Sequence, residues 1–143
     1  MQKTRRCKGQ KRSLVRSDLS RAGIAPNATV VKAQFVLKYY NRAQAGGTWV
    51  DRTIQAHRLL VDWDESQANR DYRKNGVAWS VVYGGVDGSD AQATPESSVL
   101  FTVGTPFPSY QRWDLTAPTR AWYAGTAANY GMLLLADNED VAG

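Results

Sequence analysis

Residues 110–135 constrain the fold of this chain most. From residue 110 to 116 polar and apolar side chains alternate, so that Trp113 and Leu115 share one face of an extended segment. This alternation predicts a half-buried strand. The run 132–136 is instead apolar at every position and too short to cross a membrane, which predicts a strand buried on both faces.

A short helical element is expected between these two strands. Pro118 cannot continue a strand ladder, because it has no backbone N–H. The run Thr119–Tyr123 that follows carries two adjacent aromatic residues, and it predicts a single helical turn that plugs the core. We therefore expect Trp113 and Trp122 to be core residues.

The remainder of the chain predicts an all-β domain. Residues 29–40 form the longest alternating run, with Phe35 and Tyr39 on one face and Lys38 and Tyr40 on the face expected to be wet. Further short apolar runs follow, separated by turn-forming glycines and prolines. Five Trp and seven Tyr in 143 residues agree with β structure. The prediction is an antiparallel β-sandwich or jelly roll with a short helical plug.

Charge divides the chain into a basic N-terminal arm at 1–11, a β-sandwich domain at 12–136 and an acidic C-terminal tail at 137–143. Residues 1–21 contain eight Lys or Arg and one acidic residue, whereas the whole chain has a net charge of +5. Such an arm can dock on an acidic partner surface. The residues expected to dock are Lys3, Arg5, Arg6, Lys8, Lys11 and Arg12. A solvated arm, or an edge strand that its charge keeps from aggregating, explains the same pattern.

Several partners and sites are not expected. No aromatic platform is interleaved with the basic residues, which argues against nucleic acid as the main partner. The basic start is not followed by an apolar stretch, so we expect neither a secretory leader nor membrane insertion. Cys7 is the single cysteine and cannot form an internal disulfide.

The sequence also argues against catalysis. His57 is the single histidine, and no neighbour in the sequence is placed to orient its ring. A surface or partly buried position on a strand is the simpler interpretation. The acidic corner at residues 62–65 can be interpreted as a glycosidase carboxylate pair, but an exposed corner with Trp63 turned inward is simpler. We therefore expect a protein that is not an enzyme.

Two acidic turns offer oxygen ligands of the kind that Ca²⁺ prefers. The candidate ligands are Asp62, Asp64 and Glu65 in the first turn, and Asp87 and Asp90 in the second. Their spacing matches no defined calcium loop, so a structural calcium ion is a hypothesis resting on residue type alone.

Exposed aromatic residues can stack on sugar rings, because a pyranose presents C–H groups to an aromatic face. Trp49 lies beside the loop glycines Gly46 and Gly47, and Tyr39 and Tyr40 end the longest alternating run. These three residues are the candidates for glycan binding. A packing role for them remains open.

Short motifs along most of the chain resemble the DNRLRE-type domain family, which is related to disaggregatase accessory domains and to an alginate-binding class of carbohydrate-binding modules. In chain order the matching segments are Arg12–Ser20, Ala25–Val30, Ala33–Tyr40, Val61–Ser66, Gly84–Asp90, Trp113–Thr116, Trp122 and Asn129–Leu135. Two positions depart from the family pattern. Ser17 stands where the family usually has Phe, and the usual Thr-Trp after the acidic corner is missing.

The resemblance implies a non-catalytic jelly roll of extracellular or surface proteins, without fixing the residues that bind a glycan. Two functions follow. One is a surface module that binds a polysaccharide or matrix component. The other is a structural subunit that decorates a larger particle such as a virion, docked through its basic arm and able to form a homo-oligomer. Both place the protein outside the cell or on a particle surface.

Overall fold

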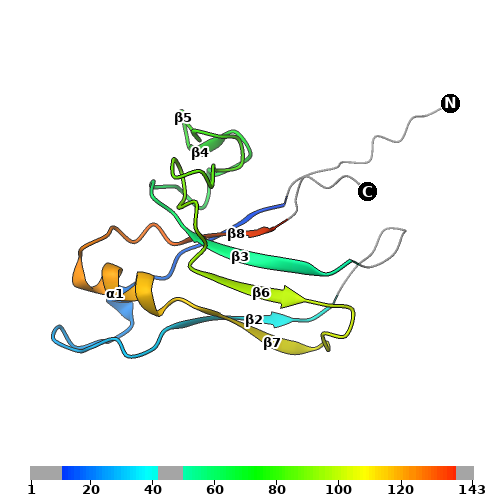
Figure 1. Ribbon diagram of the computed structural model, residues 1–143. Coiled ribbons are helices and arrows are strands. Elements are labelled where there is room, and N and C mark those ends of the chain that lie inside the picture. Colours follow the sequence, from blue (N-terminus) through cyan, green and yellow to red (C-terminus); the bar gives the residue numbers. More distant parts are fainter. Residues whose placement is uncertain (1–10, 42–49, 138–143) are drawn as a thin grey trace.

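The computed structural model describes residues 11–41 and 50–137 and consists mostly of antiparallel strands with one short α-helix (Figure 1). The expected all-β class is confirmed. The elements are β1 (Ser13–Val15), a 3₁₀ turn (Leu19–Arg21), β2 (Gln34–Tyr39), β3 (Arg52–Arg58), β4 (Tyr72–Lys74), β5 (Val77–Ala78), β6 (Ser97–Phe101), β7 (Ser109–Asp114), α1 (Thr116–Ala124) and β8 (Met132–Ala136).

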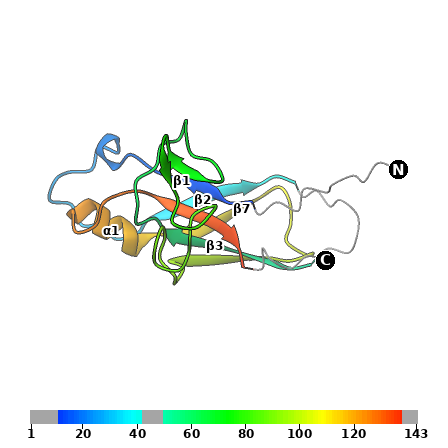
Figure 2. The same cartoon turned by 90° about the horizontal axis from the view of Figure 1, so that it is seen from above.

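The strands form one larger sheet and two small ones. The larger sheet has four strands in the order β1-β8-β3-β6, while β2 pairs with β7 and β4 pairs with β5. In Figure 1 the β2–β7 pair lies on one side of the larger sheet and the β4–β5 hairpin on the other. Helix α1 lies at the end of the molecule opposite to residues 11 and 137, where the described chain begins and ends, as the two views agree (Figures 1 and 2).

Strand β8 lies in the larger sheet between β1 and β3 and is buried on both faces. Met132 and Leu134 belong to the apolar cluster that faces the β2–β7 pair, while Leu133 and Leu135 belong to the cluster on the other face. A strand covered on both faces is apolar at every position rather than alternating. The prediction for residues 132–136 is therefore confirmed.

Trp113 joins the β2–β7 pair to the larger sheet. Its side chain is 1% exposed, and its ring centroid lies 6.0 Å from that of Phe35 and 6.3 Å from that of Phe101. The indole Nε1–H donates a hydrogen bond of 2.9 Å to the carbonyl of Ile54 on β3. The core position predicted for Trp113 is confirmed, and its buried N–H is satisfied across the layers.

Helix α1 is longer than the single turn that was expected. It begins at Thr116 because Pro118 lies in the first turn, where no intrahelical N–H is needed. It ends at Gly125, whose φ of 72° lets its N–H donate back to the helix carbonyls. Trp122 packs against the Trp113 cluster, as predicted.

The segment between β3 and β6 covers the second face of the larger sheet, which the sequence did not predict. Trp63 and Trp79 are each 6% exposed and pack there with Leu59 and Leu133. Trp63 Nε1–H donates to the Tyr130 carbonyl at 2.7 Å, and Trp79 Nε1–H donates to the Asn69 carbonyl at 2.9 Å. This segment is therefore a packed layer with little regular structure, and the inward position of Trp63 agrees with the simpler interpretation of the acidic corner.

Two strands are shorter than the alternation predicted, because side chains bind their backbone. The strand expected over residues 29–40 is limited to β2, since Arg120 donates hydrogen bonds to the carbonyls of Val30 and Val31. The apolar run at 77–83 forms a strand only as far as Ala78, because the backbone N–H groups of Ser80 and Val81 donate to the carboxylate of Asp90.

Candidate functional site

The outward face of the β2–β7 pair gathers exposed aromatic and basic side chains. In β2 the inward residues Phe35 and Tyr39 alternate with outward ones, as the period of a strand requires. In β7 the buried Trp113 alternates in the same way with outward residues. We call the outward set the β2–β7 face. Its members are Val36, Lys38, Tyr40, Tyr110 and Arg112.

The register of the two strands brings the members of this face together. Lys38 lies opposite Tyr110, and Val36 lies opposite Arg112. Side chains directly opposite one another in an antiparallel pair are in contact range, with Cβ atoms about 5 Å apart. Tyr40 extends the row beyond β2, and the Lys38 Nζ lies 5.7 Å from its ring centroid. The five residues therefore form one continuous surface.

Both tyrosines of this face are open to solvent. Tyr40 is 72% exposed and Tyr110 is 63% exposed, values far above those of the tryptophans in the two cores. Tyr110 lies on β7 and Tyr40 directly follows β2, so the paired strands constrain the spacing of the two rings. An exposed aromatic pair on a rigid sheet is suited to stack on a planar or ring-shaped ligand.

Positive charge dominates the surroundings of this face. Lys38 and Arg112 are members of it, and Lys32 and Arg120 lie close enough to Asp114 to help lower its pKa. The larger cause of the lowered pKa of Asp114 is the hydrogen bond that its carboxylate accepts from the Thr116 hydroxyl at 2.6 Å. An anionic ligand would therefore find cations beside the tyrosines and one carboxylate that is already hydrogen-bonded.

The structure places the three predicted glycan-binding residues differently. Tyr40 lies on the β2–β7 face. Tyr39 points inward, with its ring 5.0 Å from that of Phe101 and 5.9 Å from that of Phe107, and its hydroxyl is buried. We therefore leave Tyr39 out of the candidate site. Trp49 lies outside the residues that the structure describes.

Tyr110 and Arg112 were not among the predicted site residues. Alternation had placed Tyr110 and Arg112 on one face of a strand, and Lys38 and Tyr40 on the wet face of another. The missing information was the register that pairs those two strands, because pairing partners distant in the chain cannot be read from local alternation.

The predicted calcium ligands form hydrogen bonds and ion pairs within the protein. Asp62 contacts Arg16 at 3.1 Å and Lys74 at 3.4 Å. Burial would raise the pKa of Asp62, but these two partners outweigh that effect and lower it. Asp64 accepts hydrogen bonds from the backbone N–H and hydroxyl of Ser66, which lower its pKa. Its neighbour Glu65 is exposed.

In the second acidic turn, the carboxylate of Asp87 accepts hydrogen bonds from the hydroxyl and the backbone N–H of Ser89. These hydrogen bonds, that from the hydroxyl above all, lower the pKa of Asp87. Asp90 is 0% exposed and accepts hydrogen bonds from the backbone N–H groups of Ser80, Val81 and Gly85 at 2.7 to 3.0 Å. Burial would raise the pKa of Asp90, but these hydrogen bonds lower it. Asp90 thus fixes the turn by itself. Among the described residues no group of three His, Cys, Asp or Glu side chains is arranged to hold a metal ion, and calcium binding stays a prediction.

His57 is buried rather than near the surface. Its side chain is 2% exposed, its Nδ1 lies 2.7 Å from the Gln92 carbonyl oxygen, and its Nε2 lies 3.1 Å from Gln55 Oε1. Both ring nitrogens of His57 thus have hydrogen-bond partners within the protein. These contacts tie β3 to the segment that leads into β6 and assign His57 a structural role.

Only part of the basic arm is described by the structure. Lys3, Arg5, Arg6 and Lys8 lie outside the described residues. Lys11 is exposed, whereas Arg12 is partly buried and its guanidinium donates a hydrogen bond to the Gly84 carbonyl. Arg12 therefore contacts the domain itself. In residues 11–41 and 50–137, no helix combines the length and apolar character needed to cross a membrane.

A groove of about 620 Å³ lies between β1 and the layer formed by the segment between β3 and β6. Trp63 and Trp79 line it, but both rings are buried and both indole N–H groups are already bonded to backbone carbonyls. These rings offer little surface for stacking. The β2–β7 face is therefore the stronger candidate for ligand binding.

No protein-family model, curated protein or solved structure matches this chain.

Proposed function

We propose that this protein is a non-catalytic module that binds a polysaccharide on its β2–β7 face. The observation that carries the proposal is the pair of solvent-open rings, Tyr110 on β7 and Tyr40 directly after β2, beside Lys38. Tyrosine rings stack on the C–H face of a sugar, and the strand that holds Tyr110 lowers the cost of ordering its ring on binding.

The charge of this face favours an acidic polysaccharide over a neutral one. Lys38 and Arg112 flank the tyrosines, and the guanidinium of Arg112 can bind a carboxylate with two hydrogen bonds. A uronate or sulfated chain offers such groups at each sugar. Because the cations are exposed, their contribution falls as salt is added.

The fold agrees with this use. Within the all-β class, we propose that the β2–β7 pair and the larger sheet form a sandwich of the jelly-roll kind, similar to DNRLRE-type domains. The cluster around Trp113 contains side chains from both sheets, which supports this assignment. Exposure at a cell or particle exterior is part of the same proposal.

The alternative, a structural subunit docked through the basic arm, rests mainly on Lys3, Arg5, Arg6 and Lys8, which lie outside the described residues. Glycan binding rests on described side chains and is the proposal we prefer.

Electrophoresis through gels that contain a polymer tests the proposal. We expect a polyuronate such as alginate to retard the protein, and a neutral glucan to retard it less. Replacing one stacked ring, Tyr40→Ala or Tyr110→Ala, removes an interaction on the order of 1 kcal/mol and should weaken binding roughly fivefold.

Tyr72→Ala is the matched control, because Tyr72 is 46% exposed but lies on β4, away from the β2–β7 face. Its retardation should equal that of the wild type. Equal losses in all three variants, or no retardation by any acidic or neutral polymer, would contradict the proposal. A stable oligomer whose formation needs the arm would instead favour the structural subunit.

A further inference from the structure

Strand β2 has one edge that no strand of the described residues covers. It pairs with β7 on one side only. The other sheet edges are shorter or covered, since β1 has three residues and β6 lies against β7, where the Ser97 hydroxyl accepts the Asp114 N–H at 3.0 Å. With its six residues, β2 is therefore the longest open edge of the described sheets.

The backbone of β2 presents unpaired hydrogen-bonding groups at this edge. Ala33, just before β2, accepts the Leu115 N–H at 2.9 Å, so its carbonyl faces β7. Backbone direction alternates along a strand, and the N–H and C=O groups of Gln34, Val36 and Lys38 therefore face away from β7. No described residue bonds to these groups. The edge is thus a template for one more strand.

Strand β2 lacks the features that usually protect an open edge. Its pairing with β7 runs over six residues without a bulge, and the strand contains neither proline nor glycine. Val36 is 38% exposed on one face and Leu37 is 41% exposed on the other, so apolar surface is open on both faces. Lys38 is the one charged residue of the strand. This composition is typical of a strand inside a sheet.

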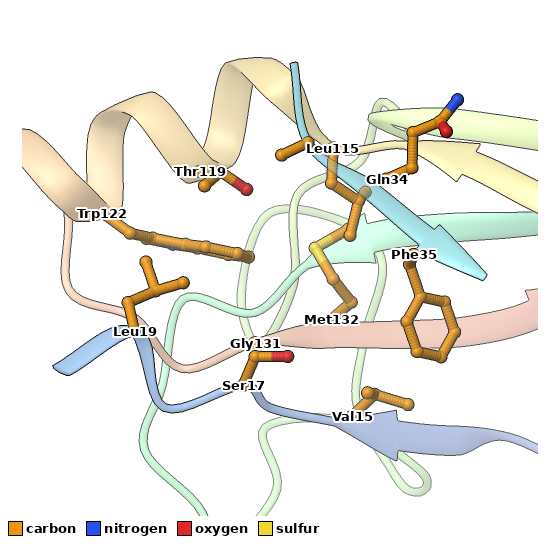
Figure 3. A pocket seen from close by; sticks show the side chains of 11 residues that line it. Val15, Ser17, Leu19, Gln34, Phe35, Leu115, Thr119, Trp122, Gly131 and Met132 are labelled. Carbon is orange, nitrogen blue, oxygen red and sulfur yellow. The ribbon is translucent and has the colours of Figure 1, made fainter. Parts of the chain in front are cut away.

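A groove between β1 and β2 follows the open edge. It consists of a cavity of about 150 Å³ under α1 and a second hollow of about 400 Å³ farther from the helix, each lined by residues at both strands. In Figure 3 Val15 of β1 and Phe35 of β2 point toward one another in the cavity under α1. Leu37 and Phe101 line the second hollow. A strand added to β2 would extend the apolar layer over this groove and cover Leu37.

We propose that a second copy of this chain adds its own β2 to this edge, in antiparallel orientation about a two-fold axis at Val36. This axis sets the two Val36 residues opposite one another and each Gln34 opposite Lys38 of the partner subunit. The outward backbone groups of all three residues then bond across the axis, and the two β2–β7 pairs become one continuous sheet.

The charge pattern of β2 favours its own copy as the partner. With the axis at Val36, Lys38 lies opposite the neutral Gln34, whereas an axis at Lys38 would set two lysines opposite one another. The apolar residues also match, because Phe35 of one copy lies opposite Leu37 of the other. These backbone bonds use neither tyrosine of the β2–β7 face, so the inference is independent of the glycan proposal.

Sedimentation equilibrium over a range of protein concentrations gives the first test. We expect a species of twice the chain mass of 15.8 kDa that dissociates on dilution. Val36→Pro removes an outward N–H that β7 does not use, so this variant should fold and stay monomeric. Val36→Thr keeps that N–H and is the matched control, which should dimerise. A wild type that is monomeric at millimolar concentration would overturn the proposal, as would a dimer that Val36→Pro leaves intact.

Two substitutions of Gln34 test the register, and they decide the question even where Val36→Pro does not fold. Gln34→Glu sets a carboxylate opposite each Lys38 of the partner subunit and should tighten the dimer roughly fivefold. Gln34→Lys sets like charges opposite one another and should weaken it by a similar factor. Equal dimer affinity in these two variants would overturn the proposal.

Cysteine crosslinking locates the interface. In a Cys7→Ser background, Val36→Cys should form a disulfide between copies on mild oxidation, because directly paired residues have Cα atoms about 5.5 Å apart. Arg112→Cys is the matched control, since Arg112 lies opposite Val36 on β7, away from the open edge, and it should not crosslink. Crosslinking of neither variant, or of both equally, would contradict an interface at β2.

Discussion

At the scale of single residues, Asp90 shows how one side chain replaces regular structure. It is fully buried, and its two carboxylate oxygens accept hydrogen bonds from three backbone N–H groups of the segment 80–85. Those groups would otherwise be available to a strand ladder. A buried carboxylate is tolerated because these donors replace the water that it loses.

We expect Asp90→Asn to destabilise the fold by about 2–3 kcal/mol, because the amide NH₂ would face a backbone donor and the remaining bonds would lose their charge. The urea midpoint gives the measurement. Asp87→Asn is the control, since Asp87 lies in the same turn but is exposed, and its effect should be within about 1 kcal/mol. Equal losses in the two variants would show that Asp90 does not fix the turn.

At the scale of elements, the junction of β1 with β8 depends on close backbone approach. Gly131 has a φ of 81°, and a Cβ atom there would lie 2.0 Å from the Val15 carbonyl oxygen and 2.9 Å from the Arg16 Cα. The Gly131 carbonyl also accepts the Leu59 N–H at 2.9 Å. Both the backbone conformation and the lack of space therefore require glycine at the start of β8.

Gly131→Ala should cost more than about 3 kcal/mol in unfolding free energy, since it adds backbone strain to a clash with β1. Gly125→Ala is the matched comparison. Gly125 has a φ of 72° but open space around the Cβ position, so only the strain of about 1 kcal/mol should appear. Similar losses at the two glycines, measured by urea unfolding, would rule out the close approach of β1 and β8.

Elements whose sequence pattern is local could be predicted from the sequence. The strands β7 and β8, the burial of Trp113 and the helix at Trp122 follow from local alternation and from one proline. The layer that carries Trp63 and Trp79 could not be predicted, because its conformation depends on Asp90 and on indole bonds to distant carbonyls. For Asp90 the residue type suggested a calcium ligand, whereas its hydrogen bonds to backbone N–H groups could not be read from the sequence.

The sequence predicted one strand of the candidate site but not the strand that pairs with it. Local alternation placed Lys38 and Tyr40 together on the wet face of their strand. Their neighbours Tyr110 and Arg112 come from a strand seventy residues later in the chain, and only the observed register brings them to the same surface. The cavity under α1 had no local signal, since its volume is what remains after four separate segments pack.

At the scale of the whole molecule, five aspartates among the described residues have a lowered pKa in the folded protein. They are Asp62, Asp64, Asp87, Asp90 and Asp114. A carboxyl group whose pKa is lower in the folded than in the unfolded chain stabilises the fold when ionised. That contribution is complete above the unfolded pKa of about 3.9, and it is lost as the pH falls through the lower, folded values.

We therefore expect the urea midpoint to change little on account of these groups between pH 7 and pH 5, and to fall steadily below about pH 4. Asp90→Asn should reduce this fall, because it removes one of the groups that must be protonated. A midpoint that stays constant or rises down to pH 3 would contradict the assigned directions.

We propose that the β2–β7 face binds an acidic polysaccharide. Backbone amide NMR shifts during titration with a uronate oligosaccharide test it most directly. We predict that the largest shifts fall on residues 34–40 and 109–114, and that they shrink in 0.5 M salt, a concentration at which screening is effective over about 4 Å. Shifts confined to the groove beside Trp63 and Trp79, or no shifts at any oligosaccharide concentration, would contradict it.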